Sequence, residues 1–161
     1  EMWGADHYSF EPDVIAAAKA LRVGATVARE EVFPDEPSRL SSTWGAGDIL
    51  ASLQGALTIE AIRDHDLLSN ATERGRQCVE QLTDRLAERP CVDDIRGLGL
   101  MLAVEFDTPD RRDAVQTAAF KRGLLTLGCG EKTLRLLPPL DVTEREIELG
   151  CELLIEAVDD T

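Results

Sequence analysis

From about residue 67 to the last residue, helical stripes of apolar residues alternate with pairs of short apolar segments. The spacing predicts, in order, helix, strand, strand, helix, strand, strand and helix. Each helix has one apolar face and each strand is short, so these elements can bury their apolar residues only by packing together. The order predicts an α+β layer with helices on one side of a small sheet, and segment 67–161 could therefore fold alone.

Residues with strong terminal preferences indicate where these elements begin and end. The first predicted elements are a helix that follows Asp66 and is stopped by Pro90, and two strands, over 92–95 and 100–106, on either side of Gly97-Leu98-Gly99. Next come a helix from Thr108 to Gly123 and two strands, over 124–127 and 134–137, which a turn at 128–132 separates. A final helix ends the series. Thr143 and Glu146 form a capping box for the final helix, whose apolar stripe includes Cys151. The stripe of the first helix includes Cys78. The two glycines of Gly97-Leu98-Gly99 are expected to be conformational rather than catalytic, because no helix start follows them.

Residues 1–66 show a different pattern. Two short apolar segments, at 14–18 and 25–28, predict strands with Lys19 in the turn between them. A helix over 48–63 should follow, with Asp48 as its N-cap. We expect one face of this helix to be buried through its recurring apolar residues, Leu50, Leu53, Leu57 and Ala61. Two short strands and one helix form no obvious core, so this segment is expected to complete a sheet whose other strands are missing.

The charge of the chain limits its partners. The net charge is -14, with three lysines against fourteen arginines. Such an acid excess opposes binding to nucleic-acid phosphates and to anionic membrane surfaces, since both require clustered cations. An excess of acidic residues with few lysines is also the composition typical of proteins from a high-salt cytoplasm, where ions screen the repulsion between the acidic side chains. We therefore expect a halophile-like protein that loses structure when salt is removed.

The cysteines and the apolar runs indicate the compartment. The four cysteines form no CxxC pair, which predicts free thiols and no structural zinc. No apolar run approaches the roughly 20 residues that span a bilayer, and the first residues do not resemble a signal peptide. The expected compartment is the cytoplasm. The chain begins at Glu1 inside what resembles continuous folded sequence, so we expect a fragment of something longer.

Three blocks of residues suited to chemistry follow one another along the chain. The segment Glu11–Lys19 closes an apolar run with a lysine, and Ser42-Thr43-Trp44-Gly45 combines hydroxyls with a glycine ahead of a helix. The segment 134–140, Leu-Arg-Leu-Leu-Pro-Pro-Leu, places Arg135 between apolar residues before two prolines, and 142–147 follows it. In order and spacing these blocks resemble the class III (omega-type) pyridoxal-phosphate aminotransferases of fold type I. The resemblance covers almost the whole chain, as the C-terminal portion of such an enzyme.

The resemblance implies an α/β fold with two parts. Residues 1–66 would be the end of the large cofactor-binding domain with a connecting helix, and residues 67–161 the small C-terminal α+β domain. In this family the aspartate that pairs with the pyridine nitrogen and the glycine-rich phosphate loop lie upstream, and no candidates occur before Trp3. The fragment is therefore expected to be inactive alone.

Lys19 is identified by the resemblance as the lysine that carries pyridoxal 5'-phosphate. A lysine attacks a carbonyl only when neutral, and burial against alanine and isoleucine would lower its pKa in the required direction. Once released by substrate, its amine can move a proton as general acid and base. The alternative is a solvated helix lysine without a catalytic role.

The resemblance also implies roles for Thr43 and Arg135. Thr43 would contact the cofactor phosphate of the neighbouring subunit, in a loop before a helix where phosphate finds N–H donors; the alternative is a simple helix cap. Arg135 would clamp the substrate carboxylate with its planar guanidinium. The alternative for Arg135 is a structural ion pair with one of the 31 acidic residues.

The implied reaction moves an amino group from an omega-amino acid or amine to a 2-oxo acid, with a 4-aminobutyrate-type or lysine-type donor. The implied assembly is a homodimer whose active site is shared between subunits. Racemases and aminomutases of the same family remain alternatives. A further alternative is a non-catalytic module, in which 67–161 serves association and Lys19 is incidental.

Overall fold

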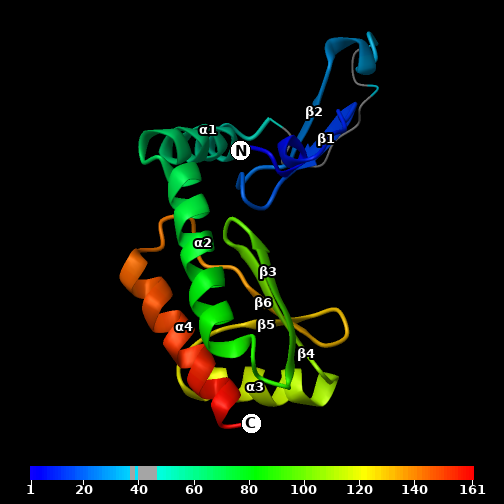
Figure 1. Ribbon diagram of the computed structural model, residues 1–161. Helices are drawn as coiled ribbons and strands as arrows, with labels where there is room; N and C mark the ends of the chain where they lie inside the picture. Colours follow the sequence, from blue (N-terminus) through cyan, green and yellow to red (C-terminus); the bar gives the residue numbers. More distant parts are fainter. Residues whose placement is uncertain (37–38, 40–46) are drawn as a thin grey trace. The chain divides into compact units, whose positions relative to one another are not determined.

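The computed structural model describes residues 1–36, 39 and 47–161 (Figure 1). The chain divides into two compact units, Glu1–Leu68 and Ser69–Thr161, and each is treated by itself. Among the described residues, no helix combines the length and the apolar character that crossing a membrane requires.

The second unit contains the predicted order of helices and strands. Its elements are α2 (Leu67–Leu86, which begins in the first unit), β3 (Val92–Leu98), β4 (Met101–Phe106), α3 (Pro109–Lys121), β5 (Leu127–Cys129), β6 (Thr133–Leu136) and α4 (Glu144–Asp159). The two largest differences from the predicted boundaries are in β3 and β5. Strand β3 continues through Gly97 to Leu98, and β5 begins only at Leu127 because the segment 124–126 after α3 has no strand partner.

The four strands form one antiparallel sheet in the order β3-β4-β6-β5. Alternate residues of β4, namely Leu102, Val104 and Phe106, are buried, while Met101 is exposed on the opposite face. Helices α2, α3 and α4 gather along the buried side (Figure 1). The predicted α+β layer, with helices on one side of a small sheet, is confirmed.

All fully buried apolar side chains of the described residues belong to the second unit. They come from the three helices, from β4 and β6, and from the loops beside them: Cys78, Leu82, Leu86, Leu100, Leu102, Val104, Phe106, Val115, Ala119, Leu134, Val142, Ile147, Cys151, Leu154, Ile155, Ala157 and Val158. The predicted stripes of the first and last of these helices supply seven of these seventeen residues. The sequence pattern therefore located the buried faces of α2 and α4 correctly.

Two glycines bring α2 against the turn between β3 and β4. Gly99 has φ +54°, a left-handed conformation in which glycine is unstrained. A Cβ on Gly75 of α2 would lie 2.1 Å from the carbonyl oxygen of Gly99. The helix can approach the hairpin this closely because Gly75 has no side chain, whereas a Cβ on Gly99 would make only ordinary contacts, the nearest at 3.7 Å.

The predicted helix caps are present. The Thr108 hydroxyl accepts a hydrogen bond from the Arg111 N–H at 3.2 Å at the start of α3, with Pro109 in the first turn. At the start of α4, the Thr143 hydroxyl accepts from the Glu146 N–H at 3.3 Å, and the Thr143 N–H donates to Glu146 Oε2 at 2.8 Å. This reciprocal pair is the capping box that the sequence predicts.

The first unit has fewer and shorter elements. They are η1 (Gly4–His7), β1 (Val14–Ala17), β2 (Ala25–Ala28), η2 (Glu30–Val32) and α1 (Ile49–Asp64). Strands β1 and β2 pair antiparallel as a hairpin. Asp48 caps α1 as predicted, since its Oδ1 accepts a hydrogen bond from the Ala51 N–H at 2.9 Å.

The prediction of which face of α1 is buried was wrong. Leu50, Leu53 and Leu57 are exposed, together with Ile49. The helix instead turns Gly55 toward the β1–β2 hairpin, where a Cβ would lie 2.7 Å from Val23 Cγ1. The absence of a side chain at Gly55 permits this contact, and it leaves the leucine stripe facing away.

Candidate active site

Lys19 lies in the turn of the β1–β2 hairpin, as the sequence predicts. The strand ends at Ala17, and a tight turn follows in which the Arg22 N–H donates to the Lys19 carbonyl at 3.2 Å. Arg22 takes a left-handed conformation with φ 66°. The hairpin therefore displays the lysine at its tip, and the two paired strands hold that tip in place.

The expected burial of Lys19 against alanine and isoleucine is not observed. Its side chain is exposed, because Ile15, Ala16 and Ala17 lie in strand β1 whereas Lys19 lies beyond the strand end. Within the described part of the chain, its amine forms no ion pair. A free, exposed amine fits a covalent attachment point.

Thr43 and its loop lie outside the described residues. What the structure does show is the start of the helix that follows. Asp48 occupies the cap of α1 and engages the Ala51 N–H, so a carboxylate already holds the positive end of this helix. A phosphate contact from this region would depend on the Thr43 hydroxyl and its own backbone.

Arg135 lies in the middle of β6 on the face of the sheet that the helices leave open. Its neighbour Leu134 is fully buried on the helix side, and strand alternation directs Arg135 to the opposite side. It is in register with Ala103 on β4 and with Leu127 on β5. The small side chain of Ala103 leaves room beside the guanidinium.

Arg135 has no acidic partner among the described residues. Its Nε is buried and lacks a hydrogen-bond partner. Arg96, on β3 and the same face, differs sharply: its Nη1 lies 2.7 Å from Asp94 and 2.9 Å from Glu105. These ion pairs raise the pKa of Arg96, chiefly through the hydrogen bond to Asp94. A buried guanidinium nitrogen without a hydrogen-bond partner is energetically costly, so Arg135 is suited to donate hydrogen bonds to the carboxylate of a ligand.

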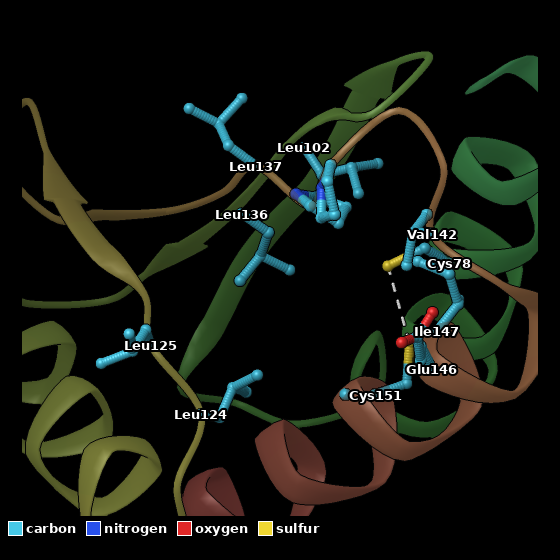
Figure 2. Close-up of a pocket in the computed structure, with 13 residues that line it drawn as sticks. Cys78, Leu102, Leu124, Leu125, Leu136, Leu137, Val142, Glu146, Ile147 and Cys151 are labelled. Atoms are coloured by element: carbon cyan, nitrogen blue, oxygen red, sulfur yellow. Dashed lines mark hydrogen bonds between the residues drawn. The ribbon is translucent and has the colours of Figure 1, made fainter. Parts of the chain in front are cut away.

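A pocket of about 270 Å³ lies on the other side of the sheet (Figure 2). Its wall is mostly apolar and includes Leu102 and Leu136 from the sheet, Leu124 beyond α3, and Ile147 from α4. Arg135 is on the opposite face and does not line it. The pocket therefore belongs to the helix-covered side and not to the face that carries the unpaired arginine.

Two features of the fold were missed by the sequence reasoning. Cys78 of α2 and Cys151 of α4 have their sulfur atoms 3.5 Å apart beside this pocket. Both positions were on predicted apolar stripes, but the stripes did not show that these two helices are neighbours. The ion pair between Arg96 and Glu105 was also missed, although Glu105 was in a predicted strand and Arg96 directly followed one.

Comparison with known proteins decides which family contains this arrangement. A family model described as Aminotransferase class-III matches residues 1–158. The chain belongs to the class-III aminotransferases. Acetylornithine aminotransferase of Prochlorococcus marinus is 36% identical over 155 residues, which are 92% of this chain and 37% of the relative. The L-lysine-epsilon aminotransferase of Amycolatopsis lactamdurans is 34% identical over 161 residues, which are 94% of this chain and 35% of the relative.

Solved structures agree with this assignment. A lysine aminotransferase from M. tuberculosis in the internal aldimine form superposes with a TM-score of 0.87 at 31% identity, over 98% of this chain and 38% of that one. An ornithine delta-aminotransferase of Plasmodium falciparum gives 0.86 at 29% identity, over 97% of this chain and 42% of its own. The predicted fold is confirmed: the chain has the α/β fold of the C-terminal portion of a pyridoxal-phosphate-dependent aminotransferase.

Class-III aminotransferases depend on pyridoxal phosphate, so the predicted cofactor of the family is confirmed. The chain spans less than half the length of the relatives reported above. The structure brings Arg135 and the paired Arg96 onto one face, and it places Lys19 at a hairpin tip in the other unit. The roles of Lys19, Thr43 and Arg135 follow as proposals.

Proposed function

We propose that this chain is the C-terminal part of a transaminase that moves an amino group from an omega-amino acid to a 2-oxo acid. The donor is of the 4-aminobutyrate or lysine type. Residues 1–66 complete the large cofactor-binding domain and residues 67–161 form the small domain. The relatives named above act, by their names, on acetylornithine, lysine and ornithine, which are amino acids with a second nitrogen remote from the carboxylate.

The observation that carries the proposal is the unpaired guanidinium of Arg135. Every 2-oxo acid and every omega-amino acid has a carboxylate, and a planar guanidinium can bind a carboxylate through two parallel hydrogen bonds. Glu105, the nearest acid on the adjacent strand, is engaged by Arg96 at 2.9 Å and by Lys132 at 3.8 Å. Arg135 is thereby left available to orient the substrate.

Lys19 is the proposed attachment and proton-transfer residue. Pyridoxal phosphate, when bound, supplies an electron sink that makes the hydrogen on the amine-bearing carbon acidic. Lys19 Nζ would take up that proton as general base and release it as general acid, and general acid–base catalysis accelerates such a transfer by about 10²–10⁴-fold. The rigid antiparallel hairpin limits the positions that Nζ can reach.

The proposed assembly is a homodimer in which Thr43 contributes a phosphate contact to the neighbouring subunit. The exposed apolar stripe of α1 supports an interface close to this loop. Its members follow a helical repeat and lie immediately after Asp48: Ile49, Leu50, Leu53 and Leu57. Such a contiguous apolar face favours contact with another surface.

The proposed compartment is a cytoplasm of high salt. All four cysteines are free, which fits a reducing compartment. A net charge of -14 is tolerated best where ions screen repulsion. Lowering potassium chloride from about 2 M to about 0.1 M, at which screening lengths approach 10 Å, should reduce the helical circular dichroism of the chain. A signal that does not change would contradict the halophile-like assignment.

A chimera tests the proposed function. The N-terminal part of the Prochlorococcus marinus relative, up to its matched portion, is joined to Glu1 of this chain. The chimera should bind pyridoxal phosphate and transfer nitrogen from lysine or 4-aminobutyrate to 2-oxoglutarate. A folded chimera that binds the cofactor but transfers nitrogen from no omega-amino acid would contradict the proposal.

Arg135→Lys in this chimera tests the clamp, with Arg96→Lys as the matched control on the same face. Half-reactions are measured with substrate pairs that differ only in the carboxylate, lysine against cadaverine and pyruvate against acetaldehyde. Loss of a two-point contact should reduce kcat/KM for a carboxylate substrate by about 10–100-fold, and for its partner by less than about 3-fold. Arg96→Lys should affect both members alike. Equal losses within both pairs for Arg135→Lys would refute the clamp.

A further inference from the structure

Two buried thiols from different helices lie side by side in the second unit. Cys78 Sγ on α2 and Cys151 Sγ on α4 are 3.5 Å apart, and each residue is 4% exposed. The helices are held together next to this pair, because Gln77 Nε2 donates to the Glu144 carbonyl at 3.1 Å. The other two cysteines, Cys91 and Cys129, are not part of this contact.

The pair is accessible through the pocket that it lines. Figure 2 shows both sulfur atoms at one side of the pocket, joined by the dashed contact. Exposed side chains, Leu125 and Leu137, line the same pocket, so it opens to solvent. A volume of about 270 Å³ admits molecules several times the size of water, which occupies about 30 Å³ in the liquid. Small neutral reagents can therefore reach thiols that bulky ones cannot.

We propose that Cys78 and Cys151 are a modification site that hydrogen peroxide converts into a reversible disulfide between α2 and α4. The inference is independent of the proposed transaminase function. It depends only on the contact, the helix packing and the opening of the pocket.

The two sulfurs have different tasks in this reaction. The contact with Cys151 lowers the pKa of the Cys78 thiol, and the same contact together with burial raises that of Cys151. Cys78 is therefore the nucleophile: its thiolate attacks one peroxide oxygen, the O–O bond breaks, and water leaves after protonation. Cys151 then gives up its proton and attacks the resulting sulfenic sulfur, and the S–O bond breaks to release a second water. Two thiols and one peroxide yield one disulfide and two waters.

The required movement is small. A disulfide has an S–S length of about 2.05 Å, so the sulfurs must approach by roughly 1.5 Å from the observed 3.5 Å. The pocket beside them provides unfilled space into which both side chains can turn. Gly150, which precedes Cys151, also lines the pocket and adds no side chain that would block this turn.

The test uses a Cys91→Ser, Cys129→Ser variant of the full chain, which retains only the buried pair. Hydrogen peroxide is added to the folded protein and the intact mass is recorded under denaturing, non-reducing conditions. The expected result is a loss of about 2 Da per chain, the two hydrogens of one disulfide, restored by dithiothreitol. After trypsin digestion, peptides 77–85 and 146–161 should be linked.

Two further variants separate this outcome from other oxidation. Adding Cys78→Ala or Cys151→Ala to the same variant should abolish the mass loss. Non-reducing electrophoresis should show a single chain and no linked dimer. A folded chain that keeps its mass, or that gains oxygen at Cys78 without forming the link, would overturn the proposal, and neither result needs the alanine variants to fold.

Discussion

The two units of this chain differ in how much apolar surface each one buries. In Ser69–Thr161, three helices cover one side of a four-stranded sheet over a continuous apolar core. In Glu1–Leu68, Gly55 is the one residue of the described part that is buried, and the leucines of α1 are exposed. Yet the exposed first unit presents Lys19, the residue that we propose carries the cofactor. A segment with so many exposed apolar side chains is suited to bury them against another protein surface.

The difference shows whether each unit has enough apolar residues and elements to form a core by itself. The second unit has enough apolar residues in regular stripes to bury a core by itself. The first unit has the same kinds of residues, but its hairpin and helix are too few to cover both faces of α1. The predictions below probe this difference, from the largest expected effect to the smallest.

Removing one leucine from a helix of each unit should have very different effects. Leu82 on α2 is 1% exposed, whereas Leu53 on α1 is 52% exposed. Leu82→Ala should lower the free energy of unfolding by about 2–5 kcal/mol because it leaves a cavity. Leu53→Ala should change it by less than about 0.5 kcal/mol in dilute solution. Urea unfolding of the chain measures both values, and equal losses would abolish the distinction between the units.

Adding a methyl group at helical glycines should sharpen the comparison. Gly75→Ala should destabilise the second unit by about 1–3 kcal/mol, since the new Cβ would lie 2.1 Å from the Gly99 carbonyl oxygen. Gly55→Ala should cost less, because the atom 2.7 Å away belongs to the Val23 side chain, which can rotate. Gly150→Ala is the control, with nothing nearer than Leu124 Cδ1 at 3.9 Å, and should stabilise by about 0.5–1 kcal/mol. Thermal unfolding should rank the three variants, from most to least stable, as Gly150→Ala, Gly55→Ala and Gly75→Ala. A Gly75→Ala chain as stable as the parent would contradict the close contact between α2 and the β3–β4 turn.

Helix caps should give the smallest effect, and again a different one in each unit. Thr143→Ala should lower the free energy of unfolding by about 1 kcal/mol, because α4 belongs to the cooperative core. Asp48→Ala should instead fray α1 without moving that transition. Amide hydrogen exchange resolved along the chain distinguishes local from global loss, and global loss for Asp48→Ala would argue that α1 is part of the main core.

The capping box also predicts a dependence on pH. Hydrogen bonds from the Thr143 backbone N–H and then its hydroxyl hold the pKa of Glu146 below its ordinary value. The lowered pKa means that this stabilisation is present above the ordinary carboxyl range and is lost as pH falls through the lowered value. Urea midpoints of the parent chain and of Glu146→Gln should therefore converge in acid, and a difference that persists or grows there would contradict this role.

Most of the fold could be predicted from the sequence because its signals are local. Thr108 with Pro109, and Thr143 with Glu146, specify helix starts through hydrogen bonds within one turn. The face of α1 could not be predicted this way. Its leucine repeat resembles a buried stripe, but a glycine on another face determined which side met the hairpin. Such a choice depends on the partner surface and not on the helix sequence.

The candidate site could be predicted in part. The turn that carries Lys19 follows from the apolar segments on either side, but its exposure does not, since that depends on contacts distant in sequence. Arg135 was identified by its apolar neighbours, whereas its lack of a partner required the register that gives Glu105 to Arg96. The contact between Cys78 and Cys151 joins residues 73 positions apart, and no local pattern encodes it.

Borohydride reduction of the cofactor-loaded chimera tests the central claim most directly. The chimera is incubated with pyridoxal phosphate, reduced, digested and mapped by mass spectrometry, with Lys19→Ala as the control. The account predicts that within this chain the reduced cofactor is found on Lys19 alone, and that Lys19→Ala has no transaminase activity. Cofactor on Lys121 or Lys132, or on no lysine of a folded chimera, would contradict it.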